Sequence, residues 1–339
     1  MAKDRRRKRA LALPLAVALV SLGATPQVLL AQQTGVERLP VHVFDVMPPS
    51  ARVLGAPGAM RIEPRACRTL PTAETRRRIV DVAVQEWGYF GFRVAPPDEG
   101  GDNDAPGSGP RRRRSLLPPT EAARVAASIA GYWAVTNEGS WIVDRQNDEW
   151  NGPDGIAARW NAPWSAAFIS WVMCEAGLDT PVQFQRAIAH HHYIDQAIRA
   201  RDGRAPTAAF VAHDPGEATI APGDLLCSSR RPVYGSLADR RRQMGAGARS
   251  HCDIVVKVDE PRGRVLAIGG NVRGVVSLKE LPATGGAGGP LRVGTGNAGR
   301  PLFAHLKLRA APIDPDAFDS SPALTLSARA RLLDTPGSR

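Results

Sequence analysis

Apolar residues recur at helical spacing through the first half of the chain. In residues 72–92 (TAETRRRIVDVAVQEWGYFGF) the apolar positions from Ile79 to Trp87 fall on one face of a helix. The same spacing predicts three further helices, over residues 119–136, 159–178 and 181–203. Gly177 and Gly203 are expected to end the last two, because glycine readily adopts the left-handed conformation that closes a helix.

The second half changes to short β-branched runs separated by Gly, Pro and Asp. These runs predict strands within residues 222–229, 251–260, 264–272, 274–281 and 301–310. Helices followed by strands predict an α+β fold, in which the helices pack on an antiparallel sheet of about five strands. A further strand-like piece, VHVFDV, lies at residues 41–46 in a Pro-rich stretch.

The same patterns divide the chain into segments. Residues 1–31 combine a basic start with a short apolar run, which predicts a secretory signal peptide; an uncleaved membrane anchor is the alternative. An extended lead-in is expected at residues 32–71 and the folded domain at 72–310. The domain would contain a flexible insertion at 94–118 and be followed by a disordered tail at 311–339. The leader predicts an exported protein, either periplasmic or secreted.

Charge narrows the choice of partners. The formal net charge is +11, and part of it lies in the leader and in RRRR at residues 111–114. In a Gly- and Pro-rich loop such a run is usually a solvated surface; the alternative is contact with an anionic envelope polymer or lipid head groups. No nucleic-acid-binding motif is found, so no nucleic-acid partner is expected. The sequence does not fix the oligomeric state.

The four cysteines show no metal-binding spacing. Cys67, Cys174, Cys227 and Cys252 can form one or two disulfides in an oxidising compartment. Cys227 and Cys252 fall in strands expected to be neighbours, so a cross-strand disulfide and a pair of buried thiols are both open. No metal and no cofactor is expected.

Three residues have the order needed for nucleophilic catalysis. Ser165 starts a predicted helix, His251 starts a strand, and Asn271 ends the next strand. A nucleophile needs a base within hydrogen-bond reach and a third group that orients the base. The free N–H groups of a helix N-terminus can stabilise the oxyanion that forms. The alternative role of Ser165 is that of a helix cap, which serine fills well.

These motifs together resemble those of the CHAP and NlpC-type amidases, bacterial papain-like enzymes that cut peptidoglycan. The matching elements are PWSAAFISW at 163–171, PGDLL at 222–226, HCDIVV at 251–256 and IGGNV at 268–272. The resemblance spans roughly residues 160–275 and implies a papain-like fold, an exported hydrolase and an envelope polymer such as peptidoglycan as its partner. In that family a cysteine stands where this chain has Ser165.

The serine leaves two functional hypotheses open. A hydroxyl is far less acidic than a thiol and needs a well-aligned base, usually supported by a carboxylate. Asp253 shares the strand face of His251 and is a candidate for that carboxylate, or else it bonds to local backbone. The first hypothesis is a hydrolase of amide or peptide bonds; the second is an inactive domain that binds envelope glycan or a protein. An esterase is disfavoured, because there is no G-x-S-x-G elbow.

Aromatic and imidazole side chains near Ser165 are candidates for substrate contact. The run AHHHYID at 189–195 does not have the spacing of a helical metal site. One of its members, His192, or the following Tyr193, is instead predicted to line a groove above Ser165. Trp160 and Trp164 flank the serine and would suit stacking on sugar or peptide, unless they are core or lid aromatics.

Overall fold

The computed structural model describes residues 35–95, 117, 119–285, 292–294 and 301–326. Within these ranges the chain forms an eight-stranded main sheet in the order β3-β8-β7-β6-β5-β10-β4, with β9 paired to β8. The strands are β3 Arg93–Val94, β4 Phe210–His213, β5 Leu225–Arg231, β6 Arg249–Asp259, β7 Arg264–Val272, β8 Val275–Thr284, β9 Arg292–Val293 and β10 Leu302–Leu308. The pair β3–β8 is parallel and the other pairs are antiparallel.

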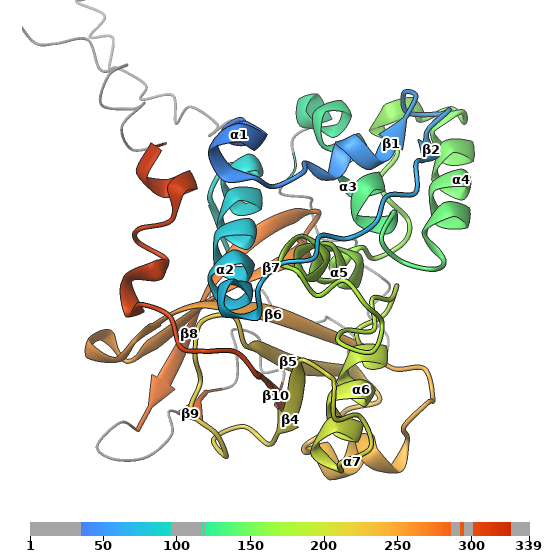
Figure 1. Cartoon of the computed structure of the whole chain (residues 1–339). Coiled ribbons are helices and arrows are strands. Elements are labelled where there is room, and N and C mark those ends of the chain that lie inside the picture. The colour runs from blue at the N-terminus through green and yellow to red at the C-terminus, as the bar shows by residue number, and fades with distance from the viewer. Residues whose placement is uncertain (1–34, 96–116, 118, 286–291, 295–300, 327–339) are drawn as a thin grey trace, which may run out of the picture. The chain divides into compact units, whose positions relative to one another are not determined.

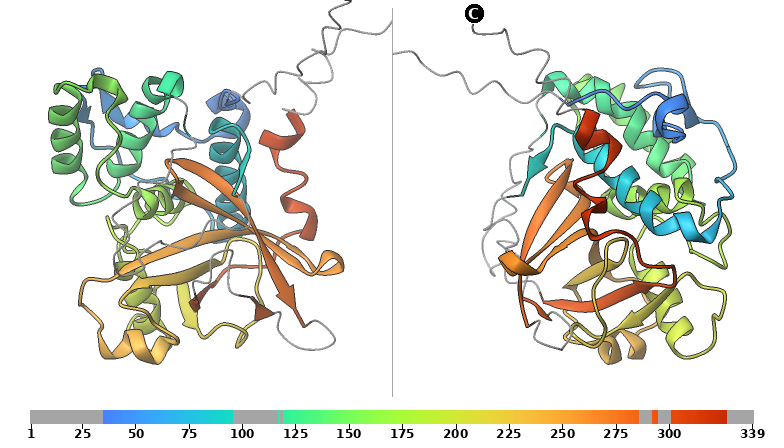
Figure 2. Two further views of the ribbon diagram at one scale, coloured as in Figure 1. Left: turned by 180° about the vertical axis from the view of Figure 1, so that it is seen from behind. Right: turned by 60° about the vertical axis from the view of Figure 1, so that its left-hand side comes forward.

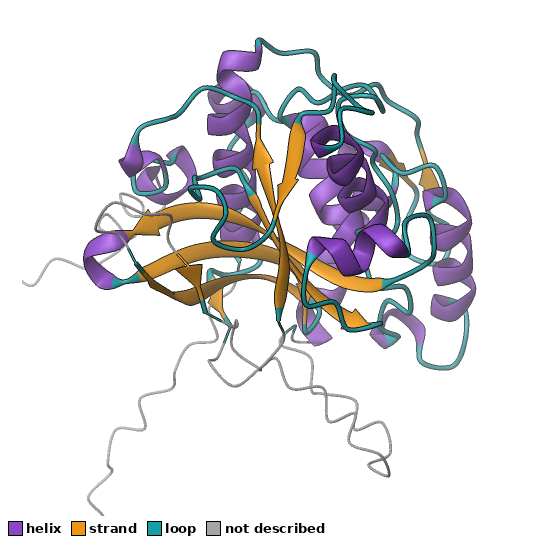
Figure 3. Cartoon of the chain, turned by 90° about the horizontal axis from the view of Figure 1, so that it is seen from below, coloured by secondary structure: helices purple, strands orange, loops and turns teal. Residues whose placement is uncertain are grey.

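The α+β prediction is therefore confirmed, but the expected size and the fully antiparallel character of the sheet were wrong. The five predicted strands correspond to β5, β6, β7, β8 and β10. The additional strands β3, β4 and β9 are two to four residues long, too short to show an alternating pattern. Figure 3 shows the long strands crossing the molecule with a strong twist.

Helices gather on one side of the sheet (Figures 1 and 2). They are α1 Val41–Phe44, α2 Thr72–Tyr89, α3 Ala122–Trp133, α4 Gly139–Trp150, α5 Ser165–Glu175, α6 His191–Arg201 and α7 Leu237–Arg242. Helices α2 and α5 contact β6 and β7, while α6 contacts β4 and β10. The main core joins the helices to this face, and a smaller cluster around Val255 and Ala267 covers part of the other.

Several predicted helix boundaries need correction. Residues 41–46 do not form a strand, because the Pro40 carbonyl accepts the N–H groups of Val43 and Phe44 and so closes the single turn α1. Residues 181–190 are not helical, and α6 begins only at His191. The Gln196 side chain holds this segment as a loop by bonding to the backbone of residues 181, 182 and 185. Helix α4 is a further element, which the apolar spacing did not predict.

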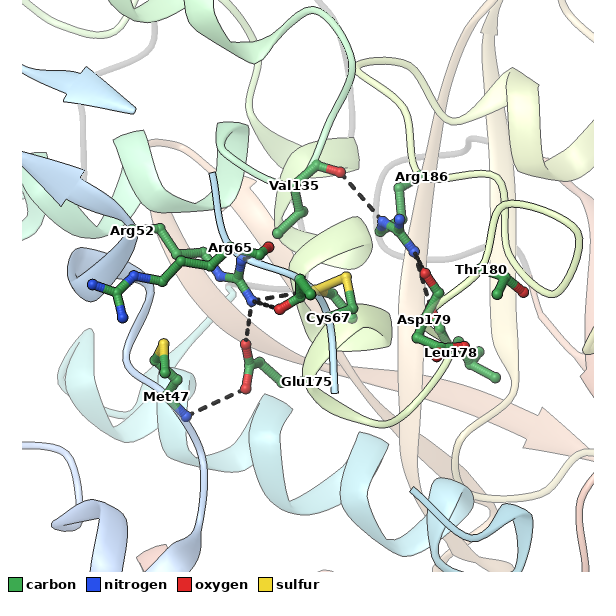
Figure 4. The surroundings of a disulfide bond; sticks show 12 residues. Met47, Arg52, Arg65, Cys67, Val135, Glu175, Leu178, Asp179, Thr180 and Arg186 are labelled. Carbon is green, nitrogen blue, oxygen red and sulfur yellow. Dashed lines mark hydrogen bonds and ion pairs between the residues drawn. A yellow bond between two sulfur atoms is a disulfide. The ribbon is translucent and has the colours of Figure 1, made fainter. Parts of the chain in front are cut away.

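The lead-in is part of the fold over its described residues. Its 3₁₀-helix Pro49–Arg52 packs on α3, and the short strands β1 Val53–Leu54 and β2 Arg61–Ile62 lie beside α3 and α4. Its links to α5 include the disulfide Cys67–Cys174 and a buried ion pair of 3.0 Å between Arg52 and Glu175 (Figure 4). An ion pair this deeply buried is costly to break, so it ties the lead-in firmly to α5.

The C-terminal residues 311–326 also pack on the domain, contrary to the expected disordered tail. Phe318 stacks on Trp87 of α2 with ring centroids 6.0 Å apart, and Arg77 bonds to Ser320.

Three predicted segments lie outside the described residues. They are the signal peptide, residues 96–116 of the insertion with its arginine run, and residues 327–339. In the ranges described, we find no helix of the length and apolar character required to cross a membrane.

One arginine connects the helical layer to the neighbouring ends of β5 and β10. Arg76 of α2 is 3 % exposed and donates to the Asp224 carboxylate at 2.9 Å, to the Pro222 carbonyl and to the Leu308 carbonyl at 2.7 Å. The fully buried Asp224 also bonds to His305 at 2.9 Å. Its pKa is lowered, because its hydrogen bond to His305 and the charge of Arg76 outweigh the effect of burial.

We expect Arg76→Ala to lower the free energy of unfolding by about 3–5 kcal/mol, because it leaves the Asp224 charge buried with less compensation. Urea denaturation of the variant and wild type measures the change. Arg77→Ala is the matched control one position along α2: its partner Asp81 is buried but Arg77 itself is 34 % exposed, so a loss of about 1 kcal/mol or less is expected. Equal losses in the two variants would contradict the proposed role of Arg76.

Candidate active site

Ser165 is the first residue of α5, and its side chain does not cap the helix. Its Oγ lies 2.7 Å from Nε2 of His190, and Ser165 is 8 % exposed. The first N–H to bond back along the helix is that of Phe168, which donates to the Trp164 carbonyl at 3.0 Å. The N–H groups of residues 165–167 therefore have no intrahelical acceptor, and such groups favour negative charge beside them.

His190 immediately precedes α6 and bridges two hydroxyl groups. Its Nε2 meets Ser165, while its Nδ1 hydrogen-bonds to the hydroxyl of Tyr193 one turn further along. Both residues are nearly inaccessible, with His190 4 % and Tyr193 1 % exposed. Burial lowers the pKa of His190 well below its ordinary value and raises that of Tyr193 well above its own, so both are neutral at neutral pH.

A second histidine lies beside the first and pairs with a carboxylate. The rings of His190 and His251 have centroids 5.3 Å apart. Nε2 of His251 is 2.9 Å from Asp253 Oδ1, and Lys279 of β8 donates to Asp253 Oδ2 at 2.8 Å. The alternation of β6 places His251 and Asp253 on one face of the strand, which allows this contact.

The charge of Lys279 sets the ionisation of the pair. Burial alone would raise the pKa of Asp253, but Lys279 and His251 together bring it below its usual range, so Asp253 is ionised. Burial lowers the pKa of His251 to about 4, helped by the cations Lys279 and Arg230 and opposed by Asp253. The His251–Asp253 contact at neutral pH is therefore a hydrogen bond from a neutral imidazole to a carboxylate.

Two glycines of β7 make room for these side chains. A Cβ atom at Gly269 would lie 1.9 Å from Asp253 Oδ1 and 3.0 Å from His251 Nε2. A Cβ atom at Gly270 would lie 2.6 Å from Cβ of Phe168 in α5. Any side chain at either position would push β7 away from the site or from the helix.

The structure thus brings together a different set of residues from the predicted Ser165–His251–Asn271 triad. Ser165 contacts His190, which the sequence analysis did not select. Asp253 is the group that contacts His251; in the described part of the chain, no hydrogen bond joins Asn271 to either histidine. Asn271 has a positive φ of 56° where β7 turns towards β8, and a register shift lies between Gly269 and Val272.

Of the four residues predicted to contact substrate, one reaches the site in the structure. Trp164 is 1 % exposed and stacks with Phe90 and Tyr132, so no face of its ring is open to a ligand. Trp160 is half-buried against Trp150, with ring centroids 5.1 Å apart. His192 stacks on His191 rather than on the serine, whereas Tyr193 reaches the site through His190.

All four cysteines are paired, as Cys67–Cys174 and Cys227–Cys252. The second disulfide joins directly opposed residues of β5 and β6, one position away from His251. Because neighbouring residues of a strand point to opposite faces, this disulfide braces the strand without offering a thiol to the site. Among the described residues, no cluster of three or more His, Cys, Asp or Glu side chains suits a metal ion.

Comparison with known proteins identifies one family. A family model described as "Uncharacterized protein conserved in bacteria (DUF2272)" matches residues 124–301, slightly more than half of the chain. The chain belongs to this family. The DUF2272 match runs from within α3 to just before β10, so it includes every residue of the site from Ser165 to Lys279. No curated protein and no solved structure matches the chain.

Removing the Lys279 charge should raise the pKa of His251. In Lys279→Met the Asp253 carboxylate loses its cationic partner and favours the imidazolium form of His251 instead. NMR titration of the His251 ring protons measures the pKa. Lys257→Met is the control, because Lys257 of β6 pairs with Asp319 outside the site. An unchanged pKa in Lys279→Met would show that the lysine does not set the charge of the pair.

Acid should destabilise the protein through His251. An unfolded imidazole binds a proton near pH ~6.5, whereas the folded group binds one only near pH 4, so stability is lost as the pH falls between these values. Between about pH 7.5 and pH 5 the contribution of His251 is about 2 kcal/mol. The fall in unfolding free energy, measured with urea at both pH values, should be smaller by that amount in His251→Gln. The same fall in variant and wild type would contradict the assigned pKa.

Proposed function

We propose that this chain is a hydrolase of amide or peptide bonds in the bacterial cell wall, with Ser165 as nucleophile and His190 as its base. The observation that carries the proposal is the 2.7 Å contact between Ser165 Oγ and His190 Nε2 at the N-terminus of α5. A nucleophile, a neutral imidazole and a set of free helix N–H groups meet at one point, which is the arrangement that acyl transfer requires.

The reaction would proceed in two steps, acylation of Ser165 and hydrolysis of the resulting ester. His190 Nε2 takes the hydroxyl proton as Ser165 Oγ bonds to the carbonyl carbon, and the N–H groups at the start of α5 hold the oxyanion. The imidazolium then gives the proton to the leaving amine, whose bond to carbon breaks and leaves an ester on Ser165. Water, deprotonated by the same imidazole, hydrolyses the ester and restores the serine.

A papain-like fold and cell-wall substrate form the finer part of the proposal. They are supported by the resemblance of the PWSAAF, PGDLL, HCDIVV and GGN elements to those of CHAP and NlpC-type amidases. The order of a nucleophile-bearing helix followed by a histidine-bearing strand is retained in α5 and β6. Export, suggested by the leader, would bring the chain to this polymer, and two disulfides are consistent with an oxidising compartment.

This proposal assigns the role of base to His190 in place of His251, and the His251–Asp253 pair has a supporting role. Burial, with a smaller contribution from the neighbouring His251, lowers the pKa of His190 and keeps the base neutral. Asp253 holds the Nε2 proton of His251, so Nδ1 carries the lone pair. That nitrogen has no hydrogen-bond partner within the described chain, and it is available to accept a bond from the substrate.

One observation favours a second candidate function, a domain that binds the cell wall without cutting it. The buried Tyr193 hydroxyl contacts His190 Nδ1 and has no other partner among the described residues. If Tyr193 donates its proton to Nδ1, then His190 Nε2 carries a proton and donates to Ser165, which blocks its action as a base. The reverse tautomer leaves the tyrosine proton buried without an acceptor, at a cost of about 1–3 kcal/mol.

Muropeptide release from purified peptidoglycan tests both candidates. We expect release by the wild-type protein to fall by at least roughly a thousandfold in Ser165→Ala and in His190→Ala. His42→Ala is the control, because it changes an exposed histidine of α1 far along the chain from the site. Loss of activity in His251→Ala with full activity in His190→Ala would return the role of base to His251.

The variant Ser165→Cys separates the two functions. A thiol ionises far more easily than a hydroxyl beside an imidazole and a helix N-terminus. Activity gained in Ser165→Cys from an inactive wild type would establish the non-catalytic role. The ¹⁵N chemical shifts of His190 report the tautomer directly, and a protonated Nε2 in the wild type would support the same conclusion.

A further inference from the structure

A small pocket opens between α4 and the loop that leads to Ser165. Its volume is about 120 Å³, and its lining residues are Trp141, Ile142, Arg145, Gln146, Asn161 and Ala162. Helix α4 stands beside α3 at the edge of the helical layer (Figure 1). The pocket is distinct from the Ser165–His190 contact, since neither residue lines it.

The pocket is held open by contacts that do not involve a ligand. The buried Gln146 side chain accepts the N–H of Asn161 at 3.1 Å and donates to the Arg159 carbonyl at 3.3 Å. Trp150 Nε1 donates to the Ala158 carbonyl at 3.1 Å, which fixes the same loop one turn further along α4. A site that is already formed loses little conformational entropy when it binds.

Its rim carries one aromatic platform and two polar groups without partners. Trp141 is 52 % exposed, which is unusual for an indole in a chain whose other described tryptophans are largely covered. Arg145 follows one helical turn later on the same face, and Asn161 faces it from the loop. Within the described chain, the Arg145 guanidinium and the Asn161 side-chain amide have no hydrogen-bond partner.

We propose that this pocket binds one saccharide ring. The C–H face of a six-membered sugar packs on an exposed indole, and its equatorial hydroxyl or acetamido groups match the planar donors and acceptors of Arg145 and Asn161. Ile142 and Ala162 supply the apolar floor. The volume of about 120 Å³ is below the roughly 300–1,000 Å³ of pockets that enclose a drug-sized ligand, so the pocket holds no more than part of a single ring.

The subsite adds glycan binding to the proposed function. Its contribution to turnover rests on that function. Asn161 and Ala162 belong to the loop that continues through Trp164 into Ser165. Four residues of chain span at most roughly 14 Å, so a sugar bound at Asn161 lies within one or two units of the serine. A glycan strand held by Trp141 would bring its attached peptide towards the nucleophile. The binding step itself requires no catalysis.

Titration calorimetry with the tetramer of N-acetylglucosamine tests the proposal on the full chain. We expect measurable binding by the wild type, a loss of at least about tenfold in affinity for Trp141→Ala, and partial recovery in Trp141→Tyr. Arg145→Ala should weaken binding more than Arg145→Lys. Val182→Ala, which alters an exposed apolar residue elsewhere (60 % exposed), should bind as the wild type does.

Repeating the titration in Ser165→Ala separates this proposal from the hydrolase. Unchanged binding in that variant, whatever its activity on peptidoglycan, supports the subsite independently of turnover. Absence of binding by the wild type, or equal affinity in Trp141→Ala, overturns the subsite and leaves the hydrolase proposal standing. Binding of a sugar-free stem tetrapeptide at the same tryptophan would also overturn it, because the ligand would then be peptide.

Discussion

The close approach of β7 to α5 holds the helix that begins at Ser165 next to the strands that carry His251 and Asp253. Gly270 lets the strand lie against Phe168, one turn into the helix that begins at Ser165, and Gly269 leaves the volume that Asp253 and His251 occupy. A Cβ atom at either position would clash with its neighbours, so the role of the two glycines is to leave this space free for them. The sequence element that suggested a role for Asn271 is therefore explained by packing, with the asparagine at the turn that follows.

Buried charges divide into two kinds with different consequences. Arg38–Glu86, Arg52–Glu175, Arg76–Asp224 and Arg240–Asp195 are pairs in which both side chains are largely covered, and they join separate elements of the fold. At the site the carboxylate is covered but its lysine is 22 % exposed. Solvated Lys279 keeps Asp253 ionised without forcing a proton onto His251. Both imidazoles are then neutral, and the surroundings of Ser165 carry little charge at neutral pH.

The sequence predicted the parts of the fold in which one regular pattern extends over many residues. Helix α2 and strands β6 to β8 are long enough to show their period, and the shared face of His251 and Asp253 follows from that period alone. The Ser165–His190 contact joins residues 25 apart and depends on the loop at 181–190, which helical spacing had assigned to α6. The packing of the lead-in and of Phe318 depends on tertiary contacts that no local pattern encodes. The spacing of His190 and Tyr193, one helical turn apart, was a usable signal for a buried pair, but the histidine run was considered only for metal binding and, through His192 or Tyr193, for lining a groove.

In the proposed mechanism, a serine where the amidases that the chain resembles have a cysteine changes which feature limits catalysis. A thiol beside a helix N-terminus ionises readily and tolerates a poorly oriented imidazole, but a hydroxyl requires the imidazole lone pair to face it. All four cysteines are already paired, and in the exported location that the proposal assigns, a fifth thiol at the site would be open to oxidation, which serine avoids. Whether His190 can act as a base then depends on the position of a single proton, the one shared between Tyr193 and His190 Nδ1. Nε2 becomes the base that Ser165 needs only in the tautomer whose proton lies on Nδ1.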